Sequence, residues 1–316
     1  MSASSARHDA PPDAAPARFD APDRSLAADL WALAKPEISF LVTLSAAAGF
    51  LLGAQGALPA FELCATLAGV FLSAGGAGAL NHYLERGHDA RMKRTAARAL
   101  PAGRVSPRFA LRYGIGLIAA GVALLCPLVS PLVAALALLT AALYLFVYTP
   151  LKRKTSLNTL VGTVPGALPA LGGYAAATGG GLSALTGAGG WAIFTVLACW
   201  QMPHFLALAW MYRNDYTRGG YAMVSRKDPT GARTAGQAVL FCTLLVGASA
   251  FPFATGDAGS LYLAGALPLG GWFLAESLRF WRERTGQRAR ALLKVSIYYV
   301  PLLLILIAAD WLFSVA

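Results

Sequence analysis

The sequence predicts an all-α polytopic membrane protein with about nine membrane-spanning helices. Hydrophobic residues make up 57% of the 316 residues, and charged residues make up only 13%. The apolar residues gather in stretches of about 20 residues, which is the length that a helix needs to cross a bilayer. Short basic segments separate these stretches, so we attribute the net charge of +11 to membrane topology and phosphate affinity. A lipid bilayer is therefore the expected partner, and nucleic acid is not.

The amino-terminal residues differ from the rest of the chain. Residues 1–24 are rich in Ala, Pro and Asp and contain no apolar run, which predicts a disordered cytoplasmic tail without a signal peptide. Residues 25–316 are expected to form one intramembrane domain. Within it, residues 25–33 are predicted to form a short interfacial helix that ends near Lys35, because the following proline disfavours helical geometry.

Nine apolar segments follow this short helix. Several of them contain Gly, Ala and Ser at short spacings, which lets helix backbones approach closely in lipid. The predicted spans cover residues 38–55, 61–81, 109–127, 130–149, 157–177, 189–211, 236–254, 260–278 and 294–314.

The basic residues predict the orientation of these spans. With nine spans, all 26 Lys and Arg residues fall on the side of the amino terminus or at the adjoining helix ends. The positive-inside rule then places the amino terminus and the basic loops in the cytoplasm. We therefore expect a multi-pass protein of the cell (inner) membrane.

The end of the second span carries the first candidate site. Asn81, Glu85 and Asp89 are spaced so that all three face the same way along about 12 Å of helix. Arg94 and Arg98 follow shortly after. Mg²⁺ prefers oxygen ligands and takes one or two carboxylates together with substrate phosphates, so this row predicts a site for Mg²⁺ and a phosphorylated ligand. A solvated, salt-bridged helix end is the alternative.

The end of the sixth span carries the second candidate site. Asp215 follows this span on the same side as the first row and is expected to complete a second metal position. Pro203 inside the span is expected to kink it and to open space beside His204. His204 is either a ligand or proton carrier, or a histidine satisfied by a neighbouring carbonyl group.

The loop after the fourth span carries the third candidate site. Lys152, Arg153 and Lys154 are followed by Asn158 at the start of the next span. Arg is a bidentate partner for phosphate and Lys is a point charge, so these residues could hold a diphosphate. A basic loop that only sets the topology is the alternative.

Four fragments in this order resemble the UbiA-type intramembrane prenyltransferases. The first is Asn81-x-x-x-Glu85-x-x-x-Asp89 with Ala-Arg-Met-Lys-Arg-Thr. The others are Tyr148-Thr-Pro-Leu-Lys-Arg-Lys-Thr, Gly166-Ala-Leu-Pro-Ala-Leu-Gly-Gly, and Trp200-Gln-Met-Pro-His-Phe with Tyr212-Arg-Asn-Asp-Tyr. Within that superfamily they are similar to the haem-farnesylating branch. The resemblance covers roughly residues 30–314.

The resemblance implies a bundle of nine helices around a central cavity. It implies transfer of the farnesyl group of farnesyl diphosphate to a vinyl group of haem b, which gives haem O, with Mg²⁺ as cofactor and a haem A synthase as a downstream partner. Asn81, Glu85 and Asp89 fall on the family's first metal motif and Asp215 on its second. The basic residues named above would bind the diphosphate, and His204 would face the haem.

The chain departs from the family pattern at three places. Glu85 stands where the family usually has Asp, Ala99 replaces a usual Pro, and Tyr221-Ala222-Met223 replaces a residue-Pro-Met run. Two other functions remain as alternatives. One is prenylation of an aromatic ring such as 4-hydroxybenzoate. The other is cation-coupled transport, which the position of the acids at helix ends disfavours, because transporters bind ions near the midplane.

Overall fold

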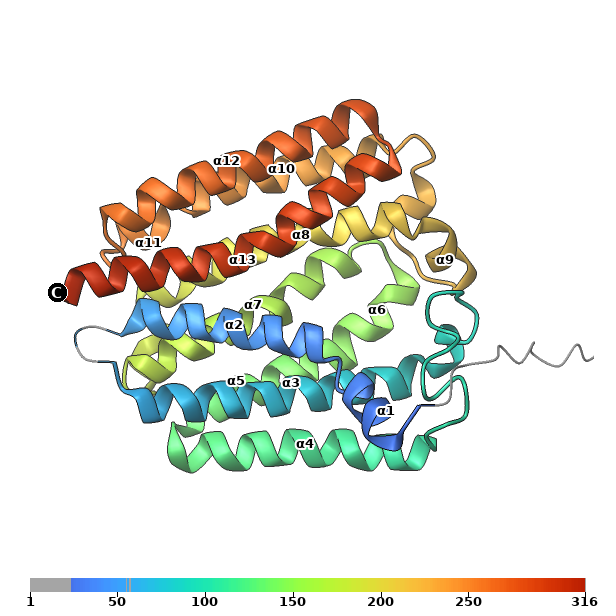
Figure 1. The fold of residues 1–316 in the computed structure, drawn as a ribbon, viewed down its shortest axis with the longest axis horizontal. Coiled ribbons are helices and arrows are strands. Elements are labelled where there is room, and N and C mark those ends of the chain that lie inside the picture. The colour runs from blue at the N-terminus through green and yellow to red at the C-terminus, as the bar shows by residue number, and fades with distance from the viewer. Residues whose placement is uncertain (1–23, 55, 57, 316) are drawn as a thin grey trace, which may run out of the picture.

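A computed structural model describes residues 24–54, 56 and 58–315 of the chain. The tail predicted to be disordered, residues 1–24, lies outside this part except for Arg24. The described residues form helices and connecting loops (Figure 1). The elements are α1 (Leu26–Leu33), α2 (Pro36–Gly53), α3 (Ala60–Asp89), α4 (Pro107–Leu128), α5 (Pro131–Ala142), η1 (Leu143–Tyr148), α6 (Thr149–Lys154), α7 (Asn158–Ala177), η2 (Leu182–Leu185), α8 (Ala188–Met211), α9 (Arg213–Arg218), η3 (Val224–Lys227), α10 (Ala232–Ala248), α11 (Phe251–Ala254), α12 (Ser260–Glu283) and α13 (Gly286–Val315).

Within the described part of the chain, nine helical stretches are long and apolar enough to span a membrane. Each corresponds to one predicted span, so the predicted fold class is confirmed. The main differences are at the basic ends, where helical geometry continues to Asp89 and Lys154 and begins already at Gly286. Hydropathy cannot detect these extensions because their residues are polar, whereas the backbone hydrogen bonds continue past the apolar stretch.

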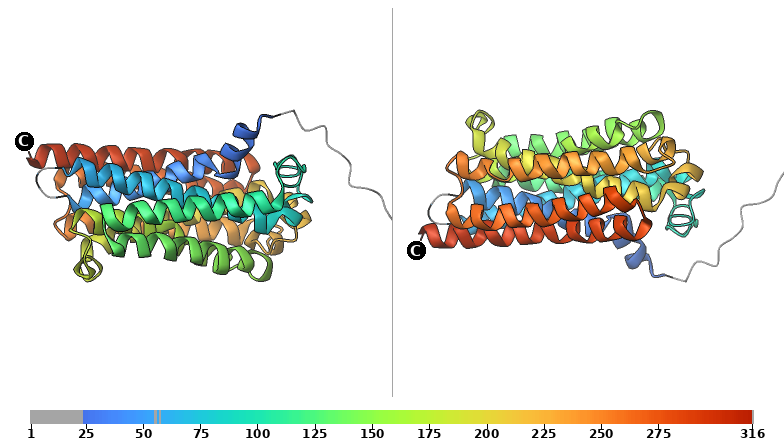
Figure 2. Two further views of the ribbon diagram at one scale, coloured as in Figure 1. Left: turned by 90° about the horizontal axis from the view of Figure 1, so that it is seen from below. Right: turned by 90° about the horizontal axis from the view of Figure 1, so that it is seen from above.

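The spanning helices form a closed ring of neighbours. Contacts run from α4 through α3, α2, α13, α12, α10, α8, α7 and α5 and back to α4. The helices lie side by side along the long axis of the bundle (Figures 1 and 2). The loop between α3 and α4 and the short helix α9 lie together at one end, and the carboxyl terminus lies at the other (Figure 1). The basic loops therefore share one end, while its assignment to the cytoplasm stays a prediction.

The short helix α1 forms as predicted. Ser25 caps it by accepting a hydrogen bond from the backbone N–H of Ala28 at 3.3 Å. The Asp29 carboxylate is buried and receives two hydrogen bonds from Arg104 of the α3–α4 loop, at 2.8 and 2.9 Å. This charged pair fixes α1 against the loop. The chain then turns sharply into α2 through Lys35, whose φ of 47° lies in the left-handed region.

Helices α2 and α7 approach so closely that two positions admit only glycine. A Cβ atom at Gly49 would lie 1.9 Å from the carbonyl oxygen of Ala170, and a Cβ atom at Gly173 would lie 1.9 Å from that of Ala46. These contacts are in the carboxyl-terminal halves of both helices, away from the basic end. Small residues that let backbones approach are a usual basis of helix packing in lipid.

A π-helical segment, η1, interrupts the fourth span at Leu143–Tyr148. The hydrogen bonds of a π-helix join residues five apart, one more than in an α-helix, and such segments often lie at functional sites. It places the rings of Tyr144 and Tyr148 in a stacked pair with centroids 5.6 Å apart. Hydropathy did not predict this segment, because its residues are nearly as apolar as those before it.

We expect Gly173→Ala to destabilise the folded protein by about 1–3 kcal/mol, because the added methyl group forces α2 and α7 apart. Gly116→Ala in α4 is the matched control, since a Cβ atom there meets no neighbour within 4 Å. The measurement is denaturant or thermal unfolding of the purified protein in detergent micelles. Equal stability of the two variants would contradict the close packing of α2 against α7.

Candidate functional site

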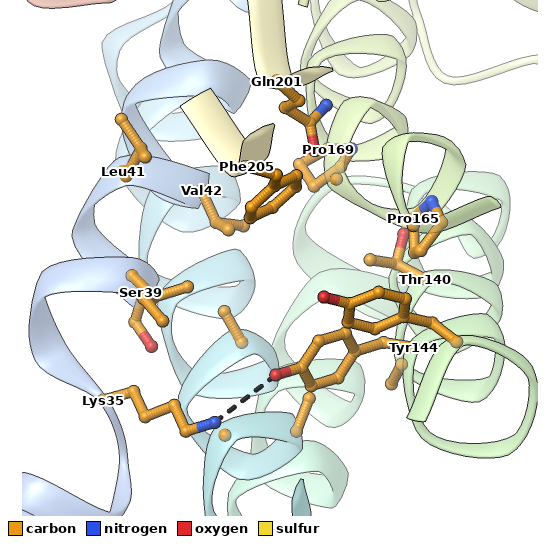
Figure 3. A pocket seen from close by; sticks show the side chains of 18 of the residues that line it. Lys35, Ser39, Leu41, Val42, Thr140, Tyr144, Pro165, Pro169, Gln201 and Phe205 are labelled. Atoms are coloured by element: carbon orange, nitrogen blue, oxygen red, sulfur yellow. Dashed lines mark hydrogen bonds between the residues drawn. The ribbon is translucent and has the colours of Figure 1, made fainter. Parts of the chain in front are cut away.

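A cavity of about 460 Å³ lies among α2, α3, α5, α7 and α8. Its deeper lining is apolar and comes mainly from residues such as Val42, Leu136 and Pro169. Its other end lies at the basic end of the bundle and is lined by charged and aromatic side chains. Figure 3 shows Lys35 and Tyr144 at one part of this lining and Gln201 and Phe205 at another. A cavity with one polar end and an apolar remainder suits a ligand with a charged head and a hydrocarbon tail.

Two carboxylates of α3 line the polar end, and each is paired with a cation from another part of the chain. Glu85 is 6% exposed, and its Oε1 lies 3.0 Å from Nζ of Lys152 in α6. Asp89 is 1% exposed, and its Oδ2 lies 2.8 Å from Nη1 of Arg98 in the α3–α4 loop. Buried charges require such partners. Glu85 and Asp89 of the predicted row are therefore buried and face the cavity, whereas Asn81 is buried but does not line it.

The carboxylate of Asp89 still has an unused oxygen. Its Oδ1 is buried and has no hydrogen-bond partner. Among the described residues, no group of three or more His, Cys, Asp and Glu could hold a metal ion. An unpartnered oxygen on one of two neighbouring carboxylates nevertheless fits Mg²⁺, which needs only one or two carboxylates when substrate phosphates supply further ligands.

Asn81 has other partners. It is fully buried, its Oδ1 accepts a hydrogen bond from Nζ of Lys35, and its Nδ2 donates to Oγ1 of Thr149 at 3.0 Å. The Lys35 ammonium also lies 3.4 Å from the hydroxyl of Tyr144 (Figure 3). Burial of this ammonium, followed by the nearby positive charge of Arg98, lowers the pKa of Lys35 to about 7.

Asp215 lies outside the cavity lining. Its Oδ1 pairs with Nη2 of Arg218 on the same short helix, α9, at 2.6 Å. The segment that follows Asp89 and the segment around Asp215 contact each other through other residues. The Arg94 guanidinium lies over the rings of Tyr212 and Tyr216, at 5.0 and 5.8 Å from their centroids. This contact joins the α3–α4 loop to the end of α8.

Two further contacts close this junction. His88 Nδ1 lies 2.8 Å from the carbonyl oxygen of Gly219, and Met92 packs with Tyr221 and Met223 in a small buried cluster. Tyr221 also lines the cavity, where burial raises the pKa of its hydroxyl. The loop that follows Asp215 therefore covers the polar end of the cavity, although Asp215 itself does not reach it.

The third candidate site divides in a similar way. Lys152 lines the cavity, whereas Arg153 contacts His88 Nε2 at 3.3 Å and Lys154 is exposed at the surface. Asn158 is fully buried and donates to the carbonyl oxygens of Thr155 and Ala222.

Ala222 is one of the departures noted above. Its backbone N–H donates to the carbonyl oxygen of Lys152 at 2.6 Å, a bond that proline could not make. The departure thus attaches the covering loop to α6, next to the cation that pairs with Glu85.

His204 lies on α8, which runs without interruption through Pro203. Its Nδ1 contacts Oγ of Ser296 in α13 at 2.8 Å, and its ring lies against Trp200 with centroids 5.4 Å apart. His204 also lines the cavity. The Ser296 hydroxyl thus forms a hydrogen bond with one ring nitrogen of His204, and His204 remains part of the cavity lining.

Several cavity residues are absent from the sequence-based predictions: Lys35, Tyr144, Tyr148, Tyr216 and Tyr221. Tyr144, Tyr148 and Lys152 are spaced at four residues, so a search for one polar face on the fourth span would have found them. Lys35 carried no comparable signal, because its direction depends on the left-handed turn before α2.

The comparisons with known proteins agree with this architecture. The profile of the UbiA prenyltransferase family matches residues 42–300. The chain is 59% identical over 283 residues to a Salinibacter ruber protein named protoheme IX farnesyltransferase, which covers 90% of this chain and 98% of the relative.

Two solved structures show the same fold at low sequence identity. The apo structure of a UbiA homolog from Aeropyrum pernix has a TM-score of 0.70 and 18% identity, and covers 86% of this chain and 97% of that chain. A UbiA homolog from Archaeoglobus fulgidus, bound to DMAPP and Mg²⁺, has a TM-score of 0.61 and 17% identity, and covers 89% of this chain and 99% of that chain. The family profile and the Salinibacter ruber protein both match most of this chain. The chain therefore belongs to the UbiA prenyltransferase family.

Proposed function

We propose that the protein transfers the farnesyl group of farnesyl diphosphate to a vinyl group of haem b, giving haem O and diphosphate with the help of Mg²⁺. The observation that carries this proposal is the cavity, which joins two buried carboxylates and several cations at one end to an apolar lining at the other. The bacterial relative named protoheme IX farnesyltransferase supports haem as the acceptor. The product would pass to the enzyme that forms haem A.

The charges at the polar end fit a diphosphate group. Lys35, Arg94, Arg98 and Lys152 line the cavity together with Glu85, Asp89 and Glu37, so the cations are in excess by one before a metal ion is added. Arg binds phosphate oxygens bidentately, and Lys provides a compact charge. The diphosphate would lie among these cations, and the hydrocarbon chain would extend into the apolar lining.

Glu85 and Asp89 would hold Mg²⁺, because their oxygens lie beside the expected diphosphate and one of them has no protein partner. When bound, the ion supplies positive charge that neutralises the departing diphosphate. In the structure Asn81 and Asp215 are engaged by Lys35 and Arg218. Neither of these two residues, Asn81 and Asp215, lines the cavity, whereas Glu85 and Asp89 do. The metal assignment therefore rests on Glu85 and Asp89, whose pairs with Lys152 and Arg98 would open as the ion and the diphosphate bind.

The reaction breaks the allylic C–O bond of farnesyl diphosphate, and the electron pair leaves with the diphosphate. Lys152, Arg94 and Arg98 stabilise this developing negative charge. The vinyl group of haem attacks the first farnesyl carbon, forming a C–C bond and leaving a cation beside the porphyrin ring. Water then adds to this cation and loses a proton, which gives the hydroxyl group of haem O. The apolar lining excludes bulk water until the C–C bond has formed.

His204 is the residue that we propose for contact with haem. It lines the cavity beside Trp200 and Phe205, two aromatic side chains suited to packing against a porphyrin. The hydrogen bond between Nδ1 of His204 and Oγ of Ser296 orients the ring, as the partners of metal-ligating histidines do, and histidine is a common ligand of haem iron.

We expect Asp89→Ala to reduce farnesyl transfer by about 100- to 1000-fold, the loss typical when a group that stabilises transition-state charge is removed. Purified membranes are incubated with farnesyl diphosphate, haem b and Mg²⁺, and farnesylated haem is detected by mass spectrometry. Glu283→Ala is the control, because Glu283 is exposed at the same end and pairs with Arg288. Near-normal turnover by Asp89→Ala would remove the metal assignment. Unchanged haem together with a prenylated aromatic acid would remove haem as the acceptor.

We expect Lys152→Met to destabilise the protein by about 3 kcal/mol, because it leaves the buried Glu85 carboxylate without its partner. The double variant Glu85→Gln with Lys152→Met should regain most of this stability, since no unpaired charge remains, yet stay inactive. Unfolding in detergent and the farnesyl-transfer assay measure the two properties. A double variant no more stable than Lys152→Met would show that the pair does not determine stability here.

We expect His204→Ala to weaken haem b binding by about tenfold or more, since even the partners of a metal-binding histidine contribute that much. Titration of the purified protein with haem, followed by the Soret absorption, gives the affinity and the ligation state. Binding of inorganic diphosphate with Mg²⁺ should be unchanged and serves as the internal control. An unaltered Soret spectrum in this variant would exclude His204 as an axial ligand.

A further inference from the structure

Lys35 has an unusual backbone conformation. Its φ of 47° and ψ of 61° place it in the left-handed region, which among ordinary residues is favoured mainly by Gly, Asn and Asp. It stands between the C-cap of α1 and Pro36, the first residue of α2. If this turn only reversed the chain, glycine would serve without strain. A lysine here indicates that its side chain is needed.

The surrounding structure determines this turn firmly. The bidentate pair of Asp29 with Arg104 anchors α1, and Oγ of Ser39 donates to the carbonyl oxygen of Ala34 at 2.8 Å. Gly78 of α3 lies directly against the turn, so that a Cβ atom there would be 3.2 Å from that same carbonyl oxygen. Strained residues persist where their surroundings fix them, and they gather at functional sites.

The side chain of Lys35 extends into the polar end of the cavity. Its ammonium is held by Oδ1 of Asn81 and lies 3.4 Å from the hydroxyl of Tyr144. Asn81 is in turn held by Thr149 at 3.0 Å. Neither partner is charged, so Lys35 differs from Lys152 and Arg98, which each pair with a carboxylate. Its charge remains available to an anion.

Lys35 also reaches the cavity from a segment that carries none of the other lining cations. Lys152 comes from α6, and Arg94 and Arg98 come from the α3–α4 loop, whereas Lys35 comes from the turn between α1 and α2. A diphosphate bound only by the other cations would be held from the α3–α4 loop and the fourth span. A cation from a third segment would add another point of attachment and help to fix its orientation.

We propose that Lys35 is a diphosphate-binding residue of the prenyl donor site, and that Asn81 positions its ammonium group rather than serving only as a metal ligand. This assignment rests on the proposed function for the identity of the donor. It differs from the sequence-based prediction, in which Asn81 is a ligand of Mg²⁺ and Lys35 has no role.

The test is calorimetric titration of the purified protein in detergent micelles with inorganic diphosphate and Mg²⁺. Lys35→Met should weaken binding about tenfold to a hundredfold, the effect of one lost hydrogen bond to a charged group. Lys35→Arg should stay within about threefold of the unmodified protein, because it keeps the charge. Lys294→Met is the matched control, since Lys294 is exposed on α13 and does not line the cavity.

A further variant separates binding from folding. Lys35→Gly relieves the left-handed strain, which offsets the loss of the hydrogen bond to the buried Asn81, so its melting temperature should stay close to that of the unmodified protein, while its diphosphate affinity should fall as in Lys35→Met. If Lys35→Met binds diphosphate as well as Lys294→Met, or if Lys35→Arg loses as much as Lys35→Met, the proposal is wrong. Because inorganic diphosphate needs no acceptor, this result is independent of whether haem is the substrate; a wrong acceptor appears only in the farnesyl-transfer assay.

Discussion

Opposite charges that are buried at the end of an apolar bundle are the interaction on which the site depends. A carboxylate near lipid is costly unless it is paired, and Glu85 and Asp89 find their partners on different segments. Lys152 joins α3 to α6, and Arg98 joins α3 to the loop that leads to α4. These two pairs gather three segments around one cavity mouth. The close contact of α2 with α7 at Gly49 and Gly173 packs the opposite half of the bundle, so that polar and apolar halves are fixed by different forces.

The same pairs explain how a charged site can exist before its ligands arrive. Without metal and diphosphate, Lys152 and Arg98 neutralise the two carboxylates. Under the proposed function, Mg²⁺ would take the carboxylates and the diphosphate would take the cations. Either ligand alone would leave buried charges of one sign without partners, whereas both together replace every interaction that is broken. Metal and diphosphate are therefore expected to favour each other's binding, a coupling that is reciprocal by thermodynamic necessity.

The sequence predicted the spans and the row of oxygens well, because both depend on patterns within single helices. Apolar length gives the spans, and helical periodicity puts Asn81, Glu85 and Asp89 on one face. The partners of these residues could not be predicted in this way. Asn81 pairs with Lys35 because a left-handed turn brings that side chain to it. Asp215 pairs with Arg218 because both lie on one short helix, and neither of them lines the cavity. The π-helical segment that positions Tyr144 and Tyr148 was also hidden, since hydropathy does not distinguish it from an α-helix.

The turn at Lys35 and the loop at Ala222 show how covering segments are tied to the charges beneath them. α1 is attached to the α3–α4 loop by Asp29 and Arg104, and it thereby fixes the direction of Lys35. On the other side, the backbone N–H of Ala222 is bound to Lys152, so the loop that brings Tyr221 over the cavity is attached to the helix that carries the cation. Lys35 and Lys152 are thus each held in place by a segment outside the membrane-spanning helices. A change in either covering segment would move a cation, and the placement of these charges depends on the loops as much as on the helices.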